Sequence, residues 1–115
     1  MEAMESTRQQ KVGSQIKTDI SDILIKEAAD FVRGAMVSVT VVRMSPDFSL
    51  AKVYVSVFPF DKSTEILKNL KTNAWVVRKA LGTRMRHQIK HIPEVAFFLD
   101  DSLEYVENIM NKLKE

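Results

Sequence analysis

Cationic side chains gather in residues 78 to 95, which read RKALGTRMRHQIKHIPEV. Between Glu65 and Glu94 the chain has seven Lys or Arg residues and no acidic residue. Such a cluster is typical of a phosphate-binding surface, although Lys and Arg runs also occur on inert, solvated helix faces. The net charge of the whole chain is only +2, so the distribution of charge carries the signal. RNA contact through this stretch is the favoured interpretation.

A glycine within this stretch suggests how an anion would be held. Gly82 is expected to interrupt a helix, because glycine lowers helix stability by roughly 1 kcal/mol relative to alanine. Thr83 is then expected to cap a new helix that runs to about His91. Arg84 and Arg86 would fall in its first turn, where positive charge opposes the helix dipole. A bound phosphate would reverse this penalty, since freed backbone N–H groups and guanidinium groups together form an anion site.

The neighbouring residues predict recognition of RNA shape more than of base sequence. Arg78 and Lys79 lie near the end of the preceding predicted helix, where the helix dipole alone explains two cations. A protein that reads single strands normally interleaves aromatic residues with its cations. Only Trp75 is close, and we interpret it as a core residue or a partner contact. Contact with the backbone of folded RNA is therefore the expected mode.

Metal binding and catalysis have little support in the sequence. His87 and His91 have the spacing of a metal-binding pair, but only Glu94 offers a further ligand and a usable site needs three or four. Neutral or phosphate-facing histidines are expected instead. Ser45 and Asp47 have no histidine near them in the sequence and are interpreted as a turn. No P-loop, dinucleotide-binding or paired-cysteine motif occurs. We expect no catalytic residue, metal, cofactor or small-molecule substrate.

These residues must be positioned by helices and strands that the apolar pattern predicts. Apolar residues three and four apart from Val12 to Leu24 indicate a helix, and Ser63 is a plausible N-cap for another that continues to Leu81. Residues 36–44 and 51–58 are β-branched and alternate, which indicates two antiparallel strands. One face of the first strand is predicted to consist of Val37, Val39 and Val41, and one face of the second of Ala51, Val53, Val55 and Val57. Residues 94–99 indicate a third strand, and a capping box formed by Asp101 and Glu104 predicts a last helix.

The expected fold class is α+β, with a three-stranded sheet covered by helices on one face. The expected order is helix, strand, strand, helix, kink, helix, strand, then a C-terminal helix. With 115 residues and 45% hydrophobic content, the chain suits one domain. We expect a flexible N-terminus over 1–5, an RNA-binding domain over 6–100 and a helical tail over 101–115.

Composition also bears on the compartment. The absence of cysteine excludes disulfides. No stretch approaches the roughly 18 apolar residues of a membrane span. A cytoplasmic protein with no membrane partner is therefore expected.

Three stretches resemble the ribosome-binding factor A family and its type II KH-like fold. They are STRQQKV at 6–12, VTVVRMSPDFSLAKVYVSVF at 39–58 and RKALGTRMRHQIKHIPEVAFFLDDS at 78–102. The resemblance implies binding to the free small (30S) ribosomal subunit and its 16S ribosomal RNA. It also implies a role in late maturation and rRNA processing, including adaptation to cold. A monomer suits such a factor.

The resemblance also implies site residues. Ala80 and Gly82 match the Ala-x-Gly kink that the family has between its central helices. The expected RNA-binding residues are Arg8, Lys11, Arg43, Arg78, Lys79, Arg84, Arg86, His87 and Lys90. One departure is Lys90, where the family commonly has an arginine, so the bidentate fork of a guanidinium is lost.

Two alternatives stay open. A BolA-like interaction module of the same fold would use His91 toward a shared metal. A KH domain that clamps single-stranded RNA needs a GxxG loop. The three glycines, Gly13, Gly34 and Gly82, cannot form that loop.

Overall fold

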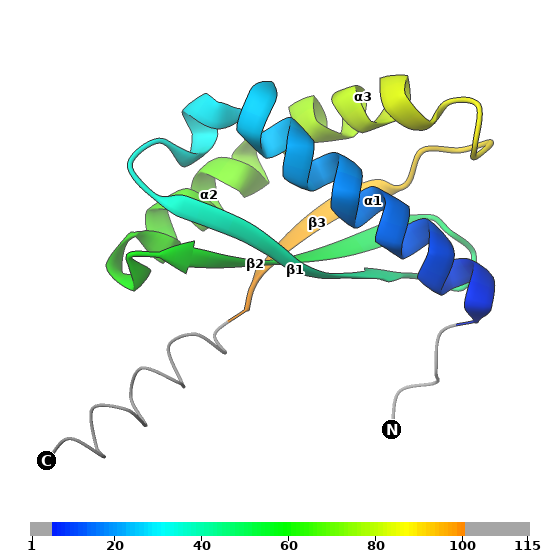
Figure 1. Cartoon of the computed structure of the whole chain (residues 1–115), viewed down its shortest axis with the longest axis horizontal. Coiled ribbons are helices and arrows are strands. Elements are labelled where there is room, and N and C mark those ends of the chain that lie inside the picture. The colour runs from blue at the N-terminus through cyan, green and yellow to red at the C-terminus, as the bar shows by residue number, and fades with distance from the viewer. Residues whose placement is uncertain (1–5, 101–115) are drawn as a thin grey trace, which may run out of the picture.

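A computed structural model describes residues 6–100 (Figure 1). The predicted segments 1–5 and 101–115 lie outside the described residues. The elements are α1 (Thr7–Lys26), β1 (Met36–Met44), β2 (Leu50–Phe58), α2 (Ser63–Thr72), α3 (Ala74–Met85) and β3 (Glu94–Leu99), with short 3-10 helices at Ala29–Val32 and Phe60–Lys62.

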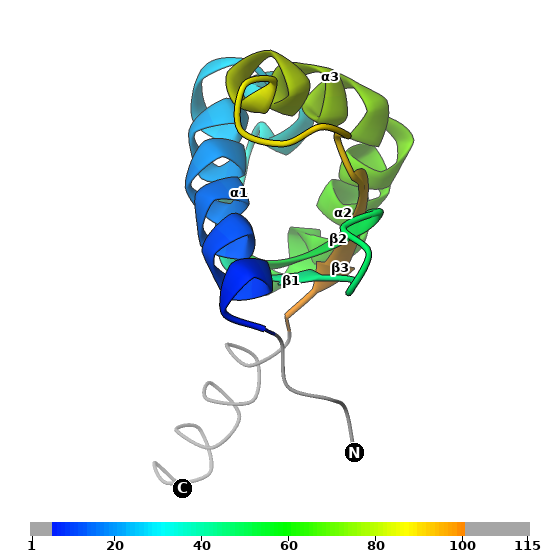
Figure 2. The same ribbon diagram turned by 90° about the vertical axis from the view of Figure 1, so that its right-hand side faces the viewer.

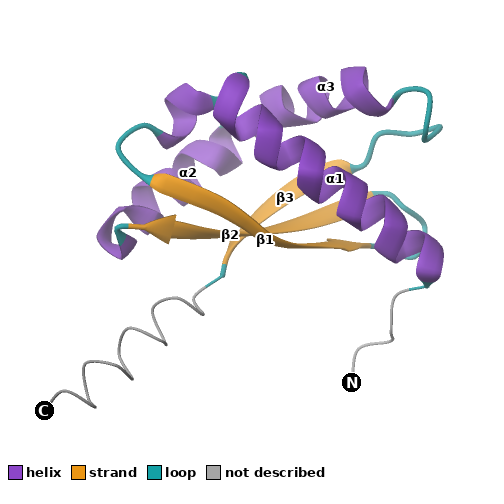
Figure 3. Ribbon diagram, in the orientation of Figure 1, coloured by secondary structure: helices purple, strands orange, loops and turns teal. Residues whose placement is uncertain are grey.

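The three strands form one mixed sheet in the order β1-β2-β3 (Figure 3). β1 and β2 pair antiparallel, as predicted, whereas β2 and β3 pair parallel. Figures 1 and 2 show α1, α2 and α3 on the same side of this sheet. The predicted α+β class, with a three-stranded sheet covered by helices on one face, is therefore confirmed.

The core lies between the sheet and the three helices. Ala51, Val53, Val55 and Val57 share one face of β2 as predicted, and this face is buried. Ile16, Ile20 and Ile23 of α1 pack into the same cluster. β1 departs from strict alternation because its register shifts between Val39 and Val41. Such a bulge inserts one extra residue and moves the following side chains to the other face. Val42 is consequently buried, and the prediction that Val41 shares a face with Val39 is wrong.

The first helix begins before its apolar pattern does. The Ser6 hydroxyl accepts a hydrogen bond from the Gln9 backbone N–H, and the Gln9 side chain accepts one from the Ser6 backbone N–H. This capping box satisfies donors that a helix start otherwise leaves free. The Gln9 amide also donates to the Met44 carbonyl oxygen at 3.0 Å. The start of α1 is thereby fixed to the end of β1.

The helix break lies at Asn73, so the predicted kink at Ala80 and Gly82 is wrong. Asn73 has φ −108° and ψ 19°, outside the helical range, and its side chain donates to the Asn69 carbonyl oxygen at 2.9 Å. α3 then runs without interruption through Gly82 to Met85. A Cβ at Gly82 would lie 3.3 Å from Cγ1 of Ile92, so close packing accounts for glycine at this position.

Two further predictions about helix starts are wrong. The separate helix expected from Thr83 to His91 does not form, because α3 already includes Thr83 and ends at Met85. Ser63 is the first residue of α2 and not its N-cap. Its hydroxyl donates back to the Phe60 carbonyl oxygen in the preceding 3-10 helix. The N-cap position belongs to Lys62, which makes no side-chain capping bond.

Candidate nucleic-acid interface

Arg84 lies in the last turn of α3, not in the first turn of a new helix. The sign of the dipole argument is therefore reversed, since cations are favourable at a helix C-terminus. Its guanidinium lies 2.8 Å from Oδ2 of Asp22 and 3.4 Å from Oε2 of Glu27, both on the α1 side. The hydrogen bond from Arg84 lowers the pKa of the Asp22 carboxyl, and the same bond raises the pKa of Arg84. Arg84 thus joins two helices and is already paired.

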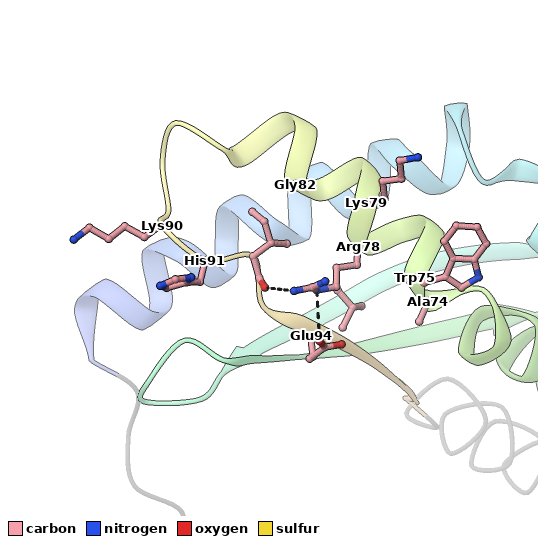
Figure 4. Close-up of a pocket in the computed structure, with 10 residues that line it drawn as sticks. Ala74, Trp75, Arg78, Lys79, Gly82, Lys90, His91 and Glu94 are labelled. Atoms are coloured by element: carbon pink, nitrogen blue, oxygen red, sulfur yellow. Dashed lines mark hydrogen bonds and ion pairs between the residues drawn. The ribbon is translucent and has the colours of Figure 1, made fainter.

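Arg78 also has a positioning role in the structure. Its Nη2 donates to the Ile92 carbonyl oxygen at 2.9 Å and its Nε to the Pro93 carbonyl oxygen at 3.1 Å. The same Nε lies 3.7 Å from Oε1 of Glu94 (Figure 4). These bonds attach the chain before β3 to the middle of α3. The dipole explanation offered for Arg78 from sequence is unnecessary, because specific acceptors are present.

Four of the predicted residues remain exposed on α3 and just after it. Lys79 lies on α3, and Arg86, His87 and Lys90 lie after its last turn. Arg86 donates from Nε to Nε2 of His87 at 3.3 Å, so these two side chains lie together. The structure therefore presents this part of the basic segment to solvent, while Arg78 and Arg84 support it from within.

The remaining predicted residues lie at the same end of the molecule. In Figure 1 the start of α1, the turn between β1 and β2, and the connection from α3 to β3 share the right-hand end. The guanidinium of Arg8 lies 5.0 Å from the centre of the Phe48 ring in that turn, within cation–π range. Lys11 is exposed on α1. Arg43 is exposed near the end of β1, on the sheet face away from the helices.

Asp47 is the acidic residue of the turn, and its charge is well satisfied. Its Oδ1 accepts hydrogen bonds from the Ser49 hydroxyl at 2.7 Å, the Ser49 amide at 3.1 Å and the Ser45 hydroxyl at 2.8 Å. These bonds, chiefly those from Ser49, lower the pKa of Asp47 to about 2. The interpretation of Ser45 and Asp47 as turn residues is confirmed.

A groove of about 620 Å³ lies between α3 and the chain from residue 90 to 95. Trp75 and Lys79 line it from α3, and Lys90 and His91 line it from the connection (Figure 4). Trp75 is 66% exposed, so its interpretation as a core residue is wrong and that as a partner contact remains a prediction. The exposure of Trp75 could have been predicted from helical spacing, because Ala74 and Val77 face inward and residue 75 then lies on the outer side of the helix.

Two features of residues 6–100 bear on other functions. No three His, Cys, Asp or Glu residues in this range lie close enough together to hold a metal ion. No helix in the same range has both the length and the apolar character that a membrane crossing requires.

Comparison with known proteins gives consistent matches over most of the chain. The sequence model of a family described as ribosome-binding factor A matches residues 8–113. The ribosome-binding factor A of Cytophaga hutchinsonii is 42% identical over 112 residues, which cover 97% of this chain and 84% of that protein. That of Clostridium perfringens is 34% identical, with 97% and 99% of the two chains covered. The crystal structure of ribosome-binding factor A from Thermus thermophilus superposes with a TM-score of 0.66 at 21% identity, covering 79% of this chain and 94% of that one.

Proposed function

The chain belongs to the ribosome-binding factor A family, and from this premise we propose that it binds the free small ribosomal subunit and assists its late maturation. A homology model of Thermus thermophilus ribosome binding factor A has been fitted into a cryo-EM map of a 30S complex, and its fold matches this chain with a TM-score of 0.65. The proposed role includes contact with 16S ribosomal RNA, support of its processing and adaptation to cold. The protein acts as a cytoplasmic monomer without catalysing a reaction.

The observation that carries the proposal is the exposed cationic end of the molecule. Lys79, Arg86 and Lys90 are exposed cations, and His87 lies beside Arg86. Phosphate contacts from Lys and Arg supply most of the sequence-independent affinity of a protein for nucleic acid. Because the chain cannot form a GxxG clamp, recognition of the phosphate backbone of folded RNA is the mode its residues favour.

The predicted RNA-binding residues then divide into two roles. Lys79, Arg86, His87 and Lys90 contact the RNA directly, and Arg8, Lys11 and Arg43 extend the same end of the molecule. Arg78 and Arg84 hold the contact surface in place through their bonds to Ile92, Pro93 and the acidic residues of α1.

The test is co-sedimentation of charge-reversal variants with isolated small subunits. The double variant Arg86→Glu with Lys90→Glu should weaken binding strongly, because two phosphate contacts become repulsions. A matched control, Lys68→Glu with Lys71→Glu, makes the same charge change at exposed positions of α2 and should bind normally. Equal loss of binding in both variants would show that only overall charge matters. Full binding by the first variant would remove this surface from the interface.

A further inference from the structure

Trp75 is the chain's single tryptophan, and it is exposed beside a cluster of cations. It follows the Asn73 break as the second residue of α3, and neighbouring Ala74 and Val77 face inward. Leaving a side chain of this size 66% exposed forgoes much of the stabilisation that its burial would give. Large exposed aromatics are found where a protein contacts a partner.

The surroundings of Trp75 indicate a negatively charged partner. Lys79 follows it by four residues, which places both on one side of α3. Figure 4 shows Lys90 and His91 at the other end of the same groove, with Arg78 and Glu94 between them. Glu94 is the acidic residue of this lining, and it lies 3.7 Å from the guanidinium of Arg78. The groove therefore combines an aromatic face with a net positive charge.

We propose that this groove binds a short unpaired stretch of RNA, with one base stacked on the indole of Trp75. Stacking on an aromatic ring is available to every base, since each has a π-face. A phosphate that flanks the stacked base would contact Lys79, and a phosphate further along the same strand would contact Lys90 at the other end of the groove. This inference rests on the proposed function and adds to it the class of RNA recognised, namely an unpaired nucleotide within folded ribosomal RNA.

The composition of the groove favours RNA over a protein partner. The centres of protein interfaces are depleted in lysine, whereas Lys79 and Lys90 both line this groove. The combination of a base-sized aromatic surface with basic side chains is characteristic of proteins that bind single-stranded nucleic acid.

Tryptophan fluorescence tests this directly, because all of the tryptophan emission comes from residue 75. The intact protein is titrated at low salt with oligoadenylate, with a blunt RNA duplex of equal phosphate content, with 16S ribosomal RNA and with small subunits. Stacking predicts quenching by oligoadenylate, by ribosomal RNA and by subunits, but not by the duplex. Binding of oligoadenylate without quenching would overturn the stacking contact. A response to subunits alone would assign Trp75 to a ribosomal protein and overturn the RNA proposal.

Variants supply the matching affinity measurement with labelled oligoadenylate. Trp75→Ala should lower the affinity roughly 5- to 100-fold, the range expected for one stacked base, and Trp75→Phe should retain most of it. Phe58→Ala is the control, because Phe58 is an aromatic residue that is 53% exposed on β2. An unchanged affinity in Trp75→Ala refutes this inference but leaves the proposed function standing if subunit binding persists. Failure of the wild-type protein to bind small subunits or ribosomal RNA overturns both.

Discussion

Two glycines inside helices allow the packing of this fold to be tested with identical substitutions. Gly13 lies in α1 and Gly82 in α3, and both helices continue past them. A Cβ added at Gly13 would lie 3.0 Å from the carbonyl oxygen of Val42, a backbone atom of β1. A Cβ at Gly82 would lie 3.3 Å from Cγ1 of Ile92, a half-buried side chain in the connection to β3. The first neighbour is rigid and the second can move.

The expected magnitudes follow from two opposing effects. Replacing glycine by alanine inside a helix stabilises it by about 0.8–1 kcal/mol, and this gain is shared by both variants. Forcing a methyl group into a filled space costs about 1–3 kcal/mol, which applies fully at Gly13 because the helix must move away from β1. Gly13→Ala should therefore be less stable than Gly82→Ala by about 1–2 kcal/mol. Gly82→Ala should be close to the wild type or slightly more stable.

Urea unfolding followed by far-UV circular dichroism measures this difference. Both variants should keep the m-value of the wild type, since the surface exposed on unfolding is unchanged. Free energies of unfolding that agree within about 0.5 kcal/mol, or a more stable Gly13→Ala, would refute the close approach of α1 to β1. Marked destabilisation of Gly82→Ala would show that the Ile92 side chain cannot move away, and it would contradict the assumption that only the Gly13 contact is rigid.

Other substitutions separate structural charges from binding charges. Arg84→Glu should lower the thermal midpoint of unfolding, because two attractions to α1 become repulsions, whereas Arg86→Glu should leave it nearly unchanged. Equal midpoints in calorimetry would contradict the structural role of Arg84. The lowered pKa of Asp47 means that its ionised form stabilises the folded state above pH 3.8, and that this contribution is lost as pH falls through about 2. When the pH is lowered over this acid range, the free energy of unfolding measured in urea should therefore fall less for Asp47→Asn than for the wild type. Identical pH profiles of the two proteins would argue against the hydrogen bonds from Ser49.

The alternation of apolar residues predicted the strands of the sheet well, because successive side chains of a strand point alternately into the core and away from it. Ala51, Val53 and Val55 alternate strictly and all become core residues. The same rule failed at Val41, because a bulge adds one residue to β1 there. Nothing in a run of β-branched residues indicates where such a register shift occurs. The fold class was thus available from the sequence, whereas the inner face of β1 was not.

The break between α2 and α3 shows how local propensity can mislead. Glycine is a poor helix former, so Gly82 was the obvious interruption, but its lack of a side chain serves packing against Ile92. Asn73 carried a usable signal, because asparagine readily leaves helical geometry and bonds to nearby backbone. Moving the break by nine positions, from residue 82 to residue 73, reversed the dipole argument for Arg84 and exposed Trp75 at a helix start.

The pairing of individual cations could not be predicted at all. Arg84 meets Asp22 and Glu27 only through the packing of α3 against α1. Arg78 reaches the Ile92 and Pro93 carbonyl oxygens because the connection folds back over α3. The sequence identified a cationic segment, and the tertiary structure decides which of its charges remain free to bind.

Subunit selectivity is the most direct test of the central claim. The purified protein is sedimented with separated small subunits, large subunits and whole ribosomes over a series of salt concentrations. The account predicts retention on small subunits alone, with the logarithm of the binding constant falling linearly with the logarithm of salt concentration, by roughly one unit of slope for each phosphate contacted. Retention on none of the particles, equal retention on all of them, or binding that salt does not weaken would contradict a phosphate-binding factor of the small subunit.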